Sequence, residues 1–503
     1  MTEIAHPDRL AKVEALRAAG IDPYPARGMT AEPIASLLAA VGTPEAPGPR
    51  LGSEVVIAGR LLALRDFGKL IFAPVVDRTG TLQIGLERDR LGEWWPKRKL
   101  FDGGDLVGAR GLLGHTKKGE PTLWVTELTL LAKAVAPPPE KWHGLTDIEA
   151  RYRRRYVDLW AGEGVREVFQ KRSRIVSSIR RFLEAQGYLE VETPTLHPIL
   201  GGATARPFVT HYNALDHDFF LRIAPELYLK LCIVGGLERV FEIARNFRNE
   251  GLSPRHNPEF SMLELYEAQA DYRRMMEIAE TLIETVAREA NGTTEVVFRG
   301  QRYDLKAPFE RRSYLELFEQ HVGCAYDDEP RVRAKARELG LKDPGSFAKL
   351  SNDVFEACVE DHLRGPIIVH DYPVEISPLA KRKPGAPRIA ERFEVFLGGM
   401  ELGNAFSELN DPADQYQRFA EQVASKDPEA PGEIDVDYVQ ALEYGMPPAG
   451  GLGIGIDRLV MVLTGQDTIR DVLLFPALRP LARAEEAGAA PVIQAAPGAG
   501  KNS

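Results

Sequence analysis

Short apolar segments, separated by glycines and charged turns, fill residues 51–136. Five of them, VVIAGRLLAL, LIFAPVVD, TLQIGLE, DLVGARGLLG and TLWVTELTLLAKAV, have the length and composition of β-strands. A more helical stretch around EWWPKRKL lies between the third and the fourth. Five strands interrupted in this way predict a small β-barrel of the oligonucleotide-binding (OB) type. The alternative is a barrel that serves only as a packing spacer.

Before the barrel, apolar residues follow a helical period. Leu10, Val13 and Leu16 fall near one face of a helix that ends at Gly20. Proline, alanine and glycine then dominate, so residues 1–50 are predicted to form a helix and a linker. Similar compositions predict a second linker at 137–150, which contains PPPEKWHG, and a disordered tail at 483–503.

Residues 151–482 mix helical segments with strand-like ones. The strand-like runs are FFLRIA, ERVFEIARNF, EFSMLELYEA, RFEVFLGGMELGNAFSEL and GLGIGID. They do not alternate strictly with helices, which predicts an α+β domain with a mostly antiparallel sheet. Neither GxGxxG after a strand nor GxxxxGK[ST] occurs, so the two common nucleotide-binding folds are not indicated.

The composition is that of a globular protein with more than one domain. The 503 residues are 44% hydrophobic and 27% charged, which is enough for a core without disulfides or structural metals. Cys232, Cys324 and Cys358 are far apart, which excludes a disulfide framework and a thiolate zinc site and fits a reducing compartment. No apolar run is long enough to cross a membrane, and the N-terminus does not resemble a secretory signal. We therefore expect a cytoplasmic protein without a membrane segment.

The net charge of −10 argues against general binding to nucleic acid, which would have to use a local patch. Residues 51–136 carry 13 lysines and arginines against 10 aspartates and glutamates, a small basic surplus that permits such a patch.

Four segments place charged residues inside apolar runs, where a charge is costly unless it is paired or used. In RIAPELYLKLCIVGG, Pro225 suits the first turn of a helix and Glu226 follows it. Taken alone, Glu226 is explained by the helix dipole. In GGLGIGIDRL, a glycine-rich strand leads into a helix near Arg458, where a phosphate partner would explain an arginine. The alternative is that these glycines serve tight sheet packing.

Two further segments have the pattern of hairpins. RVFEIARNFRNEGLSPRHNPEFSMLELYEA has two strand-like runs around a polar loop, and its alternative is a solvated hairpin with ordinary cross-strand pairs. RFEVFLGGMELGNAFSELN breaks at Gly398-Gly399, and its carboxylates indicate a hard cation or an ammonium group. Because side chains alternate along a strand, residues two apart share a face. The sets that share a face are Asn246, Arg248 and Glu250; Phe260, Met262, Glu264 and Tyr266; and Asn404, Phe406 and Glu408. In addition, Glu394, Glu401 and Glu408 are spaced seven residues apart.

Together the four segments resemble class II aminoacyl-tRNA synthetases, and specifically lysyl-tRNA synthetases of the bacterial type. FRNEGLSPRHNPEF is similar to motif 2 of that class, and GLGIGIDRL with TIRDVLLFP is similar to motif 3. FLEAQGYLEVETPTL, with Pro194, looks like motif 1, which implies a homodimer. The relatives for aspartate and asparagine share the barrel, but do not usually carry segments of the RHNPEFxMxELY and ELGNxFSELND types.

The resemblance implies an anticodon-binding OB-fold domain at 51–136 and a catalytic domain at 151–482, with an antiparallel sheet flanked by helices. The implied partners are ATP, L-lysine and tRNA(Lys), with Mg2+ as cofactor. Lysine and ATP would give lysyl-adenylate, whose lysyl group passes to the terminal ribose of the tRNA.

The resemblance also implies roles for individual residues. Arg248 and Arg458 would be catalytic, holding the α- and γ-phosphates, and Glu394 and Glu401 would bind magnesium. The remaining ATP residues would be Glu250, Arg255, His256 and Phe260. The lysine pocket would consist of Gly202, Ala224, Glu226, Glu264, Tyr266, Asn404, Phe406 and Glu408, and the anticodon would meet Arg65, Phe72 and Gln83.

The sequence departs from the family pattern at three places: Met400 replaces a basic residue, Ala244 replaces a polar one, and GMPPAGGLG differs slightly from the usual run. Three alternatives to a lysine–tRNA ligase are testable. An aspartyl or asparaginyl ligase would need cations in the pocket, a ligase that lysylates a protein would typically lack the barrel, and an RNA-binding module without catalysis would lack Arg248 or Arg458.

Overall fold

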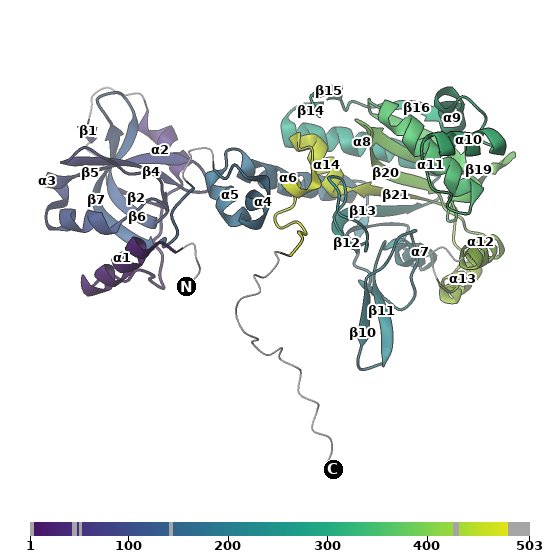
Figure 1. Cartoon of the computed structure of the whole chain (residues 1–503), viewed down its shortest axis with the longest axis horizontal. Helices are drawn as coiled ribbons and strands as arrows, with labels where there is room; N and C mark the ends of the chain where they lie inside the picture. Colours follow the sequence, from purple (N-terminus) through teal and green to yellow (C-terminus); the bar gives the residue numbers. More distant parts are fainter. Residues whose placement is uncertain (1–4, 43–47, 50–52, 140–143, 426–431, 481–503) are drawn as a thin grey trace, which may run out of the picture. The chain divides into compact units, whose positions relative to one another are not determined.

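A computed structural model describes residues 5–42, 48–49, 53–139, 144–425 and 432–480. The chain forms two compact units, Met1–Leu145 and Thr146–Ser503 (Figure 1). The expected tail at 483–503 lies outside the described residues, as does part of the expected linker at 137–150. None of the helices in these ranges has both the length and the apolar character that crossing a bilayer requires.

The first unit is built on a closed barrel of five long strands, as predicted. In spatial order β2, β4, β5, β7 and β6 are neighbours, and β6 pairs with β2 to complete the circle. Closure removes the exposed edges that an open sheet of this size would present. The strands are β2 (Val55–Leu61), β4 (Leu70–Val76), β5 (Thr81–Glu87), β6 (Leu106–His115) and β7 (Pro121–Ala132).

Short elements surround the barrel. The predicted N-terminal helix is α1 (Pro7–Ala18), and the helical stretch before β6 forms α3 (Arg88–Leu91) and η1 (Gly92–Leu100). The segment expected to be a linker contains α2 (Ile34–Val41), whose Ile34 and Leu37 are buried in the same cluster as the barrel core. The two remaining strands of this unit are β1 (Gly48–Pro49) and β3 (Arg65–Asp66).

The second unit is built on a nine-stranded sheet. Its interior pairs are antiparallel, as expected, but β8 pairs in parallel with β12, and β16 with β17. The sheet is therefore mixed at its two edges. In spatial order the strands are β16 (Glu310–Ser313), β17 (Ile367–Pro373), β19 (Ala386–Leu397), β20 (Met400–Ser407), β21 (Ala449–Gly455), β13 (Glu259–Ala268), β12 (Arg239–Phe247) and β8 (Leu189–Glu190), while β18 (Arg382–Lys383) pairs with β19.

Three helices pack together against one side of this sheet, namely α6 (Val165–Ala185), α8 (Tyr272–Asn291) and α14 (Ile456–Thr464). In α8, Met275, Ile278 and Leu282 are buried at helical spacing, so the helix presents an apolar stripe to the sheet. Asp271 caps its N-terminus by accepting hydrogen bonds from two backbone amides. This layer leaves the opposite side of the central strands available for a site.

The other elements of the second unit surround that opposite side and the sheet edges or pack against the helix layer (Figure 1). Near the site are α7 (Glu226–Val234), α11 (Phe347–Val359), η2 (Glu360–His362), η3 (Val374–Ile376), α12 (Pro412–Ser425) and α13 (Val436–Glu443). A three-stranded sheet consists of β9 (Leu196–His197), β10 (Val209–Tyr212) and β11 (His217–Leu221). The remainder are α4 (Ile148–Arg153), α5 (Arg155–Ala161), β14 (Glu295–Phe298), β15 (Gln301–Asp304), α9 (Tyr314–Val322), α10 (Glu329–Glu338) and α15 (Ile469–Val472).

Candidate active site

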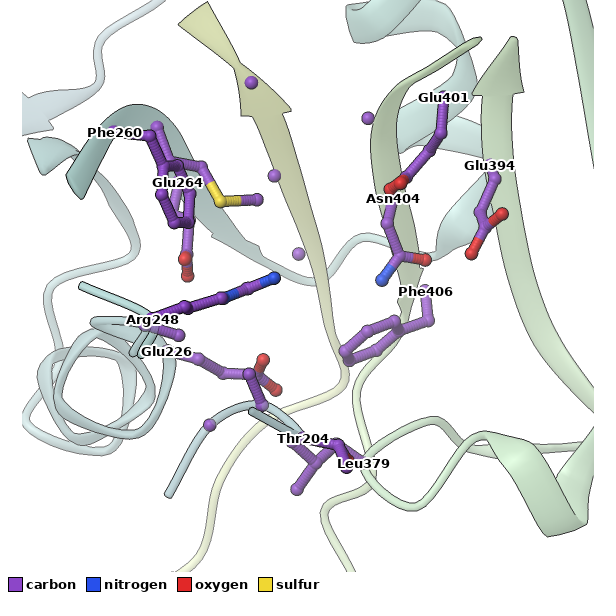
Figure 2. Close-up of a pocket in the computed structure, with 18 of the residues that line it drawn as sticks. Thr204, Glu226, Arg248, Phe260, Glu264, Leu379, Glu394, Glu401, Asn404 and Phe406 are labelled. Carbon is purple, nitrogen blue, oxygen red and sulfur yellow. The ribbon is translucent and has the colours of Figure 1, made fainter. Parts of the chain in front are cut away.

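A cavity of about 490 Å³ lies over the central strands of the second unit (Figure 2). Residues of β13, β20 and β21 line it, and along β13 and β21 they are mainly alternate residues, because successive side chains of a strand point to opposite faces. The parity predicted from the sequence is confirmed for Phe260, Met262, Glu264 and Tyr266, which all line the cavity. The predicted residues that line it are Gly202, Ala224, Glu226, Arg248, Glu250, Arg255, His256, Phe260, Glu264, Tyr266, Glu394, Glu401, Asn404, Phe406 and Arg458.

Strands β12 and β13 form the predicted antiparallel hairpin, and Arg248 follows β12 directly. Its backbone amide donates to the carbonyl of Pro258 at 2.8 Å, which ties the two ends of the loop together. The side chain extends into the middle of the cavity, between Glu264 and Glu226 (Figure 2). Its guanidinium carbon lies 5.1 Å from the centre of the Phe260 ring.

Arg248 is prepared to receive an anion. Its Nε is buried and has no hydrogen-bond partner in the part of the chain that the structure describes. Burial lowers the pKa of this guanidinium, which means that its charge is poorly solvated. A buried donor without a partner is uncommon and costly, so an incoming phosphate or carboxylate would stabilise it.

Arg458 lies at the start of α14, on the same cavity. Its Nη1 donates to the carboxylate of Glu401 at 3.0 Å and to the Glu401 carbonyl at 2.8 Å. Its Nη2 lies 3.2 Å from Nε2 of His256, and Nδ1 of His256 lies 2.8 Å from the Ser253 hydroxyl. An arginine can only donate, so His256 is neutral with its proton on Nδ1. Burial and the positive charge of Arg458 lower the pKa of His256 in agreement with this assignment.

Two buried acids face the cavity from different elements. Glu264 on β13 is only 4% exposed, and Glu226 begins α7. Burial raises the pKa of Glu264 to about 8, with repulsion from Glu226 adding to the effect, and the Tyr266 hydroxyl donates to Glu264 at 3.3 Å. Burial also raises the pKa of Glu226. Carboxylates with raised pKa values in a cavity mark a candidate functional site, and a bound cation would favour their ionised form.

Glu408 lies on the same side of the sheet as Tyr266, as its parity predicted, but it does not reach the cavity lining. It follows the end of β20 and is buried, and it is not among the described residues that line the cavity. Its Oε1 lies 2.1 Å from the position that a Cβ on Gly451 would take, and its carboxylate forms an ion pair of 2.5 Å with Lys230. Contact between Glu408 and a substrate therefore stays a prediction.

Glu394 and Glu401 lie on β19 and β20, which the predicted turn at Gly398-Gly399 joins. Both glycines have positive φ, as a tight two-residue hairpin turn requires. Burial raises the pKa of Glu394 to about 7 and Glu401 contributes to this, although Arg392, at 2.6 Å, opposes it. Within the described ranges no three acidic, histidine or cysteine side chains are grouped to hold a metal. Two carboxylates are nevertheless a usual protein contribution to a Mg2+ ion that also binds substrate phosphates.

Met400, which stands where the family pattern has a basic residue, does not belong to this site. It is fully buried in the core on the helix side of the sheet, the opposite side from Glu401.

Several residues on the cavity escaped the sequence argument. Arg392 stands two residues before Glu394, on the same face of β19, so strand parity could have identified it. Glu356 and Glu360 come from α11 and η2. In the sequence, these glutamates look the same as glutamates on the solvent-exposed face of an ordinary helix. Burial raises the pKa of Glu360 to about 8, and Glu356 adds to the effect.

In the barrel, the three predicted residues come together. Arg65 on β3 lies opposite Phe72 on β4, and its Nη2 donates to the side-chain oxygen of Gln83 at 2.9 Å. Phe72 also contacts the Trp124 ring, with a centroid distance of 6.0 Å. An aromatic ring beside an exposed arginine is the arrangement that single-stranded bases stack on.

Two stretches of the chain, which cover the barrel and the unit with the acidic cavity, match known families. Residues 147–479 match the family described as class II tRNA synthetases (D, K and N), and residues 55–131 match the OB-fold nucleic acid binding domain. The chain therefore belongs to the class II tRNA synthetases.

Relatives within that family carry a more particular name. The lysine–tRNA ligase of Moorella thermoacetica is 52% identical over 94% of this chain and 97% of its own length. The lysine–tRNA ligase of Magnetococcus marinus is 50% identical over 94% of this chain and 96% of its own. That of Azoarcus sp. is 51% identical over 85% of this chain and 87% of its own.

Proposed function

We propose that this chain is a lysine–tRNA ligase, which activates L-lysine with ATP and transfers it to tRNA(Lys) for translation in the cytoplasm. The observation that carries the proposal is the buried pair of acids, Glu226 and Glu264, beside Arg248. A substrate with two ammonium groups and one carboxylate complements this arrangement of charges. The names of the relatives support the same amino acid.

The first step needs alignment rather than a general base, because the lysine carboxylate is already a nucleophile. It must approach the α-phosphate of ATP while the developing charge is neutralised. Arg248, with its buried Nε free for an anion, would hold the α-phosphate. Arg458 would hold the γ-phosphate from the start of α14. The rest of the ATP site would consist of Glu250, Arg255, His256 and Phe260.

Mg2+ would be held by Glu394 and Glu401. When bound, the ion would supply positive charge that offsets the mutual repulsion of the phosphate oxygens. It would also relieve the repulsion that Glu401 exerts on Glu394.

Lysine would enter with its α-amino group toward Glu226 and its side-chain ammonium toward Glu264 and Glu408, next to Tyr266. A neutral analogue would leave buried carboxylates without a partner, which costs several kcal/mol. Asn404 and Phe406 would line the pocket, with Gly202 and Ala224 at its edge. Gly202 has positive φ, and an added Cβ would meet the Glu226 Cβ at 3.2 Å, so this close approach requires glycine.

The anticodon of tRNA(Lys) would bind the barrel at Arg65, Phe72 and Gln83. A splayed base would stack on Phe72, and Gln83, which donates to Thr122 at 2.9 Å, has a fixed orientation for reading a base edge.

A homodimer is also part of the proposal, and apolar residues on the outside of the second unit support it. Val209, Tyr212 and Leu215 are exposed on the β10–β11 hairpin, and Leu196 is exposed on β9, which pairs with β11. A concentration of exposed apolar residues marks an interaction surface.

The test is ATP–pyrophosphate exchange, measured with each of the twenty amino acids. Lysine is expected to support exchange, because only it supplies two ammonium groups to the acids. Exchange with aspartate and none with lysine would refute the proposal.

A further inference from the structure

Lys230 is a charged residue that the proposed reaction does not use. It lies one helical turn after Glu226 on α7 and is 0% exposed. Its Nζ is 2.6 Å from Glu226 Oε1 and 2.5 Å from Glu408 Oε2, and it lies 5.3 Å from the centre of the Phe406 ring. Burying an ammonium group is costly unless it is paired. A fully buried ammonium next to the substrate cavity therefore needs a reason.

Lys230 connects the acids of the lysine pocket to each other. Glu226 comes from α7 and lines the cavity, whereas Glu408 comes from the end of β20 and is not among the described residues that line it. Both touch the same ammonium, so the position of one carboxylate depends on the other. The other titratable or charged groups around this cluster are Tyr438 on α13, Tyr266 and Glu264 on β13, Arg248 between Glu226 and Glu264, and Arg392 on β19, which acts on Glu226.

The charges of the cluster match the substrate. Glu226, Glu264 and Glu408 carry three negative charges when ionised, and Lys230 offsets one of them. Two negative charges remain for the two ammonium groups of lysine, while Arg248 is available for an anionic group.

We propose that Lys230 is a positioning residue of the lysine site, which holds Glu226 and Glu408 in place, favours their ionised form against the effect of burial and offsets one of the three acidic charges. The inference rests on the proposed function. Lys230 acts through the two carboxylates and does not itself touch the substrate.

Replacing Lys230 by methionine tests this, because methionine has a similar length and no charge. Without the ammonium, the two buried carboxylates lose the cation that favours ionisation, so their pKa values rise and one binds a proton at neutral pH. We expect the KM for lysine to rise at least about tenfold at pH 7, with the KM for ATP changed less than about twofold.

The pH dependence separates this role from simple packing. As pH rises, the protonated carboxyl ionises again, so the ratio of the lysine KM of Lys230→Met to that of the wild type should fall. We expect a fall of at least about threefold between about pH 6.5 and 8.5. Taking the ratio removes the titration of the substrate lysine itself. A packing defect would lower the active fraction or kcat without making this ratio depend on pH.

The barrel supplies a matched control. The Lys133 side chain is also 0% exposed and also pairs with two carboxylates, Asp102 at 2.6 Å and Asp105 at 2.9 Å. Lys133→Met removes an equally buried ammonium from the other unit, and the lysine KM and its pH dependence should not change.

Because Lys230→Met leaves two carboxylates unpaired, the variant could fail to fold. The same comparison is therefore made in a Glu408→Gln background, where only Glu226 loses its partner. The ratio of lysine KM between Lys230→Met/Glu408→Gln and Glu408→Gln should again fall as pH rises. Ratios that stay flat with pH in every background that folds would overturn the role of Lys230. No lysine-dependent exchange by the wild type would overturn the proposed function, and this inference with it.

Discussion

At the scale of the residue, the Glu264 carboxyl shows how position sets chemistry. On an exposed surface it would be ionised at neutral pH, but burial on β13 raises its pKa to about 8. The pocket therefore holds an acid that is partly protonated at neutral pH. A bound ammonium group would favour the ionised form, so cation binding and loss of the proton are linked.

Glu264→Gln is expected to raise the KM for lysine and to leave the KM for ATP largely unchanged. A hydrogen bond to a charged group contributes about 1.5–3 kcal/mol, which corresponds to about a ten- to hundredfold change. The measurement is ATP–pyrophosphate exchange at varied lysine and varied ATP. Wild-type values of the lysine KM in the variant would remove Glu264 from the pocket.

The pH profile checks the same residue in another way. Glu264 is protonated below its pKa of about 8 and cannot then pair with an ammonium, so the wild-type lysine KM should fall as pH rises toward that value. Glu264→Gln should lack this component. Glu267→Gln is the control, because Glu267 is buried on the same strand but bonds to Tyr188 at 2.6 Å, away from the cavity.

At the scale of the element, β21 explains why the sequence has so many glycines before α14. The strand runs between β13 and β20, which both carry large side chains on the cavity side. A Cβ on Gly453 would lie 2.4 Å from the Met262 side chain. The strand therefore needs glycine so that Glu264, Tyr266 and Asn404 can approach its backbone.

Gly451→Ala should disturb the acids directly, because the new Cβ would lie 2.1 Å from Glu408 Oε1 and 2.5 Å from the Tyr266 ring. We expect a loss of about 1–3 kcal/mol in the free energy of unfolding, as for an overpacked core, together with a higher lysine KM. Denaturant unfolding and exchange kinetics measure the two effects. Gly365→Ala, where the added Cβ meets nothing within 4 Å, is the control. Equal stability of the two variants would contradict the packing argument.

At the scale of the whole molecule, the two compact units carry different groups of candidate site residues. The charges for activating an amino acid belong to the second unit, and the predicted anticodon residues belong to the first. Each unit has its own buried core. Changes in the barrel should therefore affect recognition of the tRNA and leave adenylate formation intact.

Phe72→Ala removes the ring on which a base would stack, a contribution of about 1–3 kcal/mol. We expect weaker tRNA charging, seen as a higher KM for tRNA(Lys), with unchanged ATP–pyrophosphate exchange. Circular dichroism monitors the fold of the barrel. A comparable loss in both steps would indicate misfolding rather than lost stacking.

The proposed dimer also belongs to this scale. Leu215 is 61% exposed and Val209 57% exposed, and both lie in the β10–β11 hairpin region. Val209→Lys/Leu215→Lys should shift the protein from dimer to monomer in light scattering, because two charges replace apolar contacts. Leu339→Lys, at an exposed leucine at the end of α10, should have no such effect. A wild-type protein that is monomeric at all concentrations would exclude the dimer.

The sequence by itself determined the features that depend on local periodicity. Alternation placed Phe260, Glu264 and Tyr266 on one face, and the Gly398-Gly399 pair marked a hairpin turn. Such signals are readable because strand geometry and turn conformation depend on neighbouring residues. The barrel strands were predictable for the same reason.

Only the tertiary structure decided how distant segments combine. Three features could not be predicted from periodicity in the sequence. They are the packing of α2 on the barrel, the parallel pairing of the edge strands, and the contribution of Glu360 to the cavity. Lys230 and Glu408 are the clearest case, since the burial of each charged side chain is explained by the ion pair with the other. A buried charge depends on which groups surround it in space, and the chain has to fold before those groups meet.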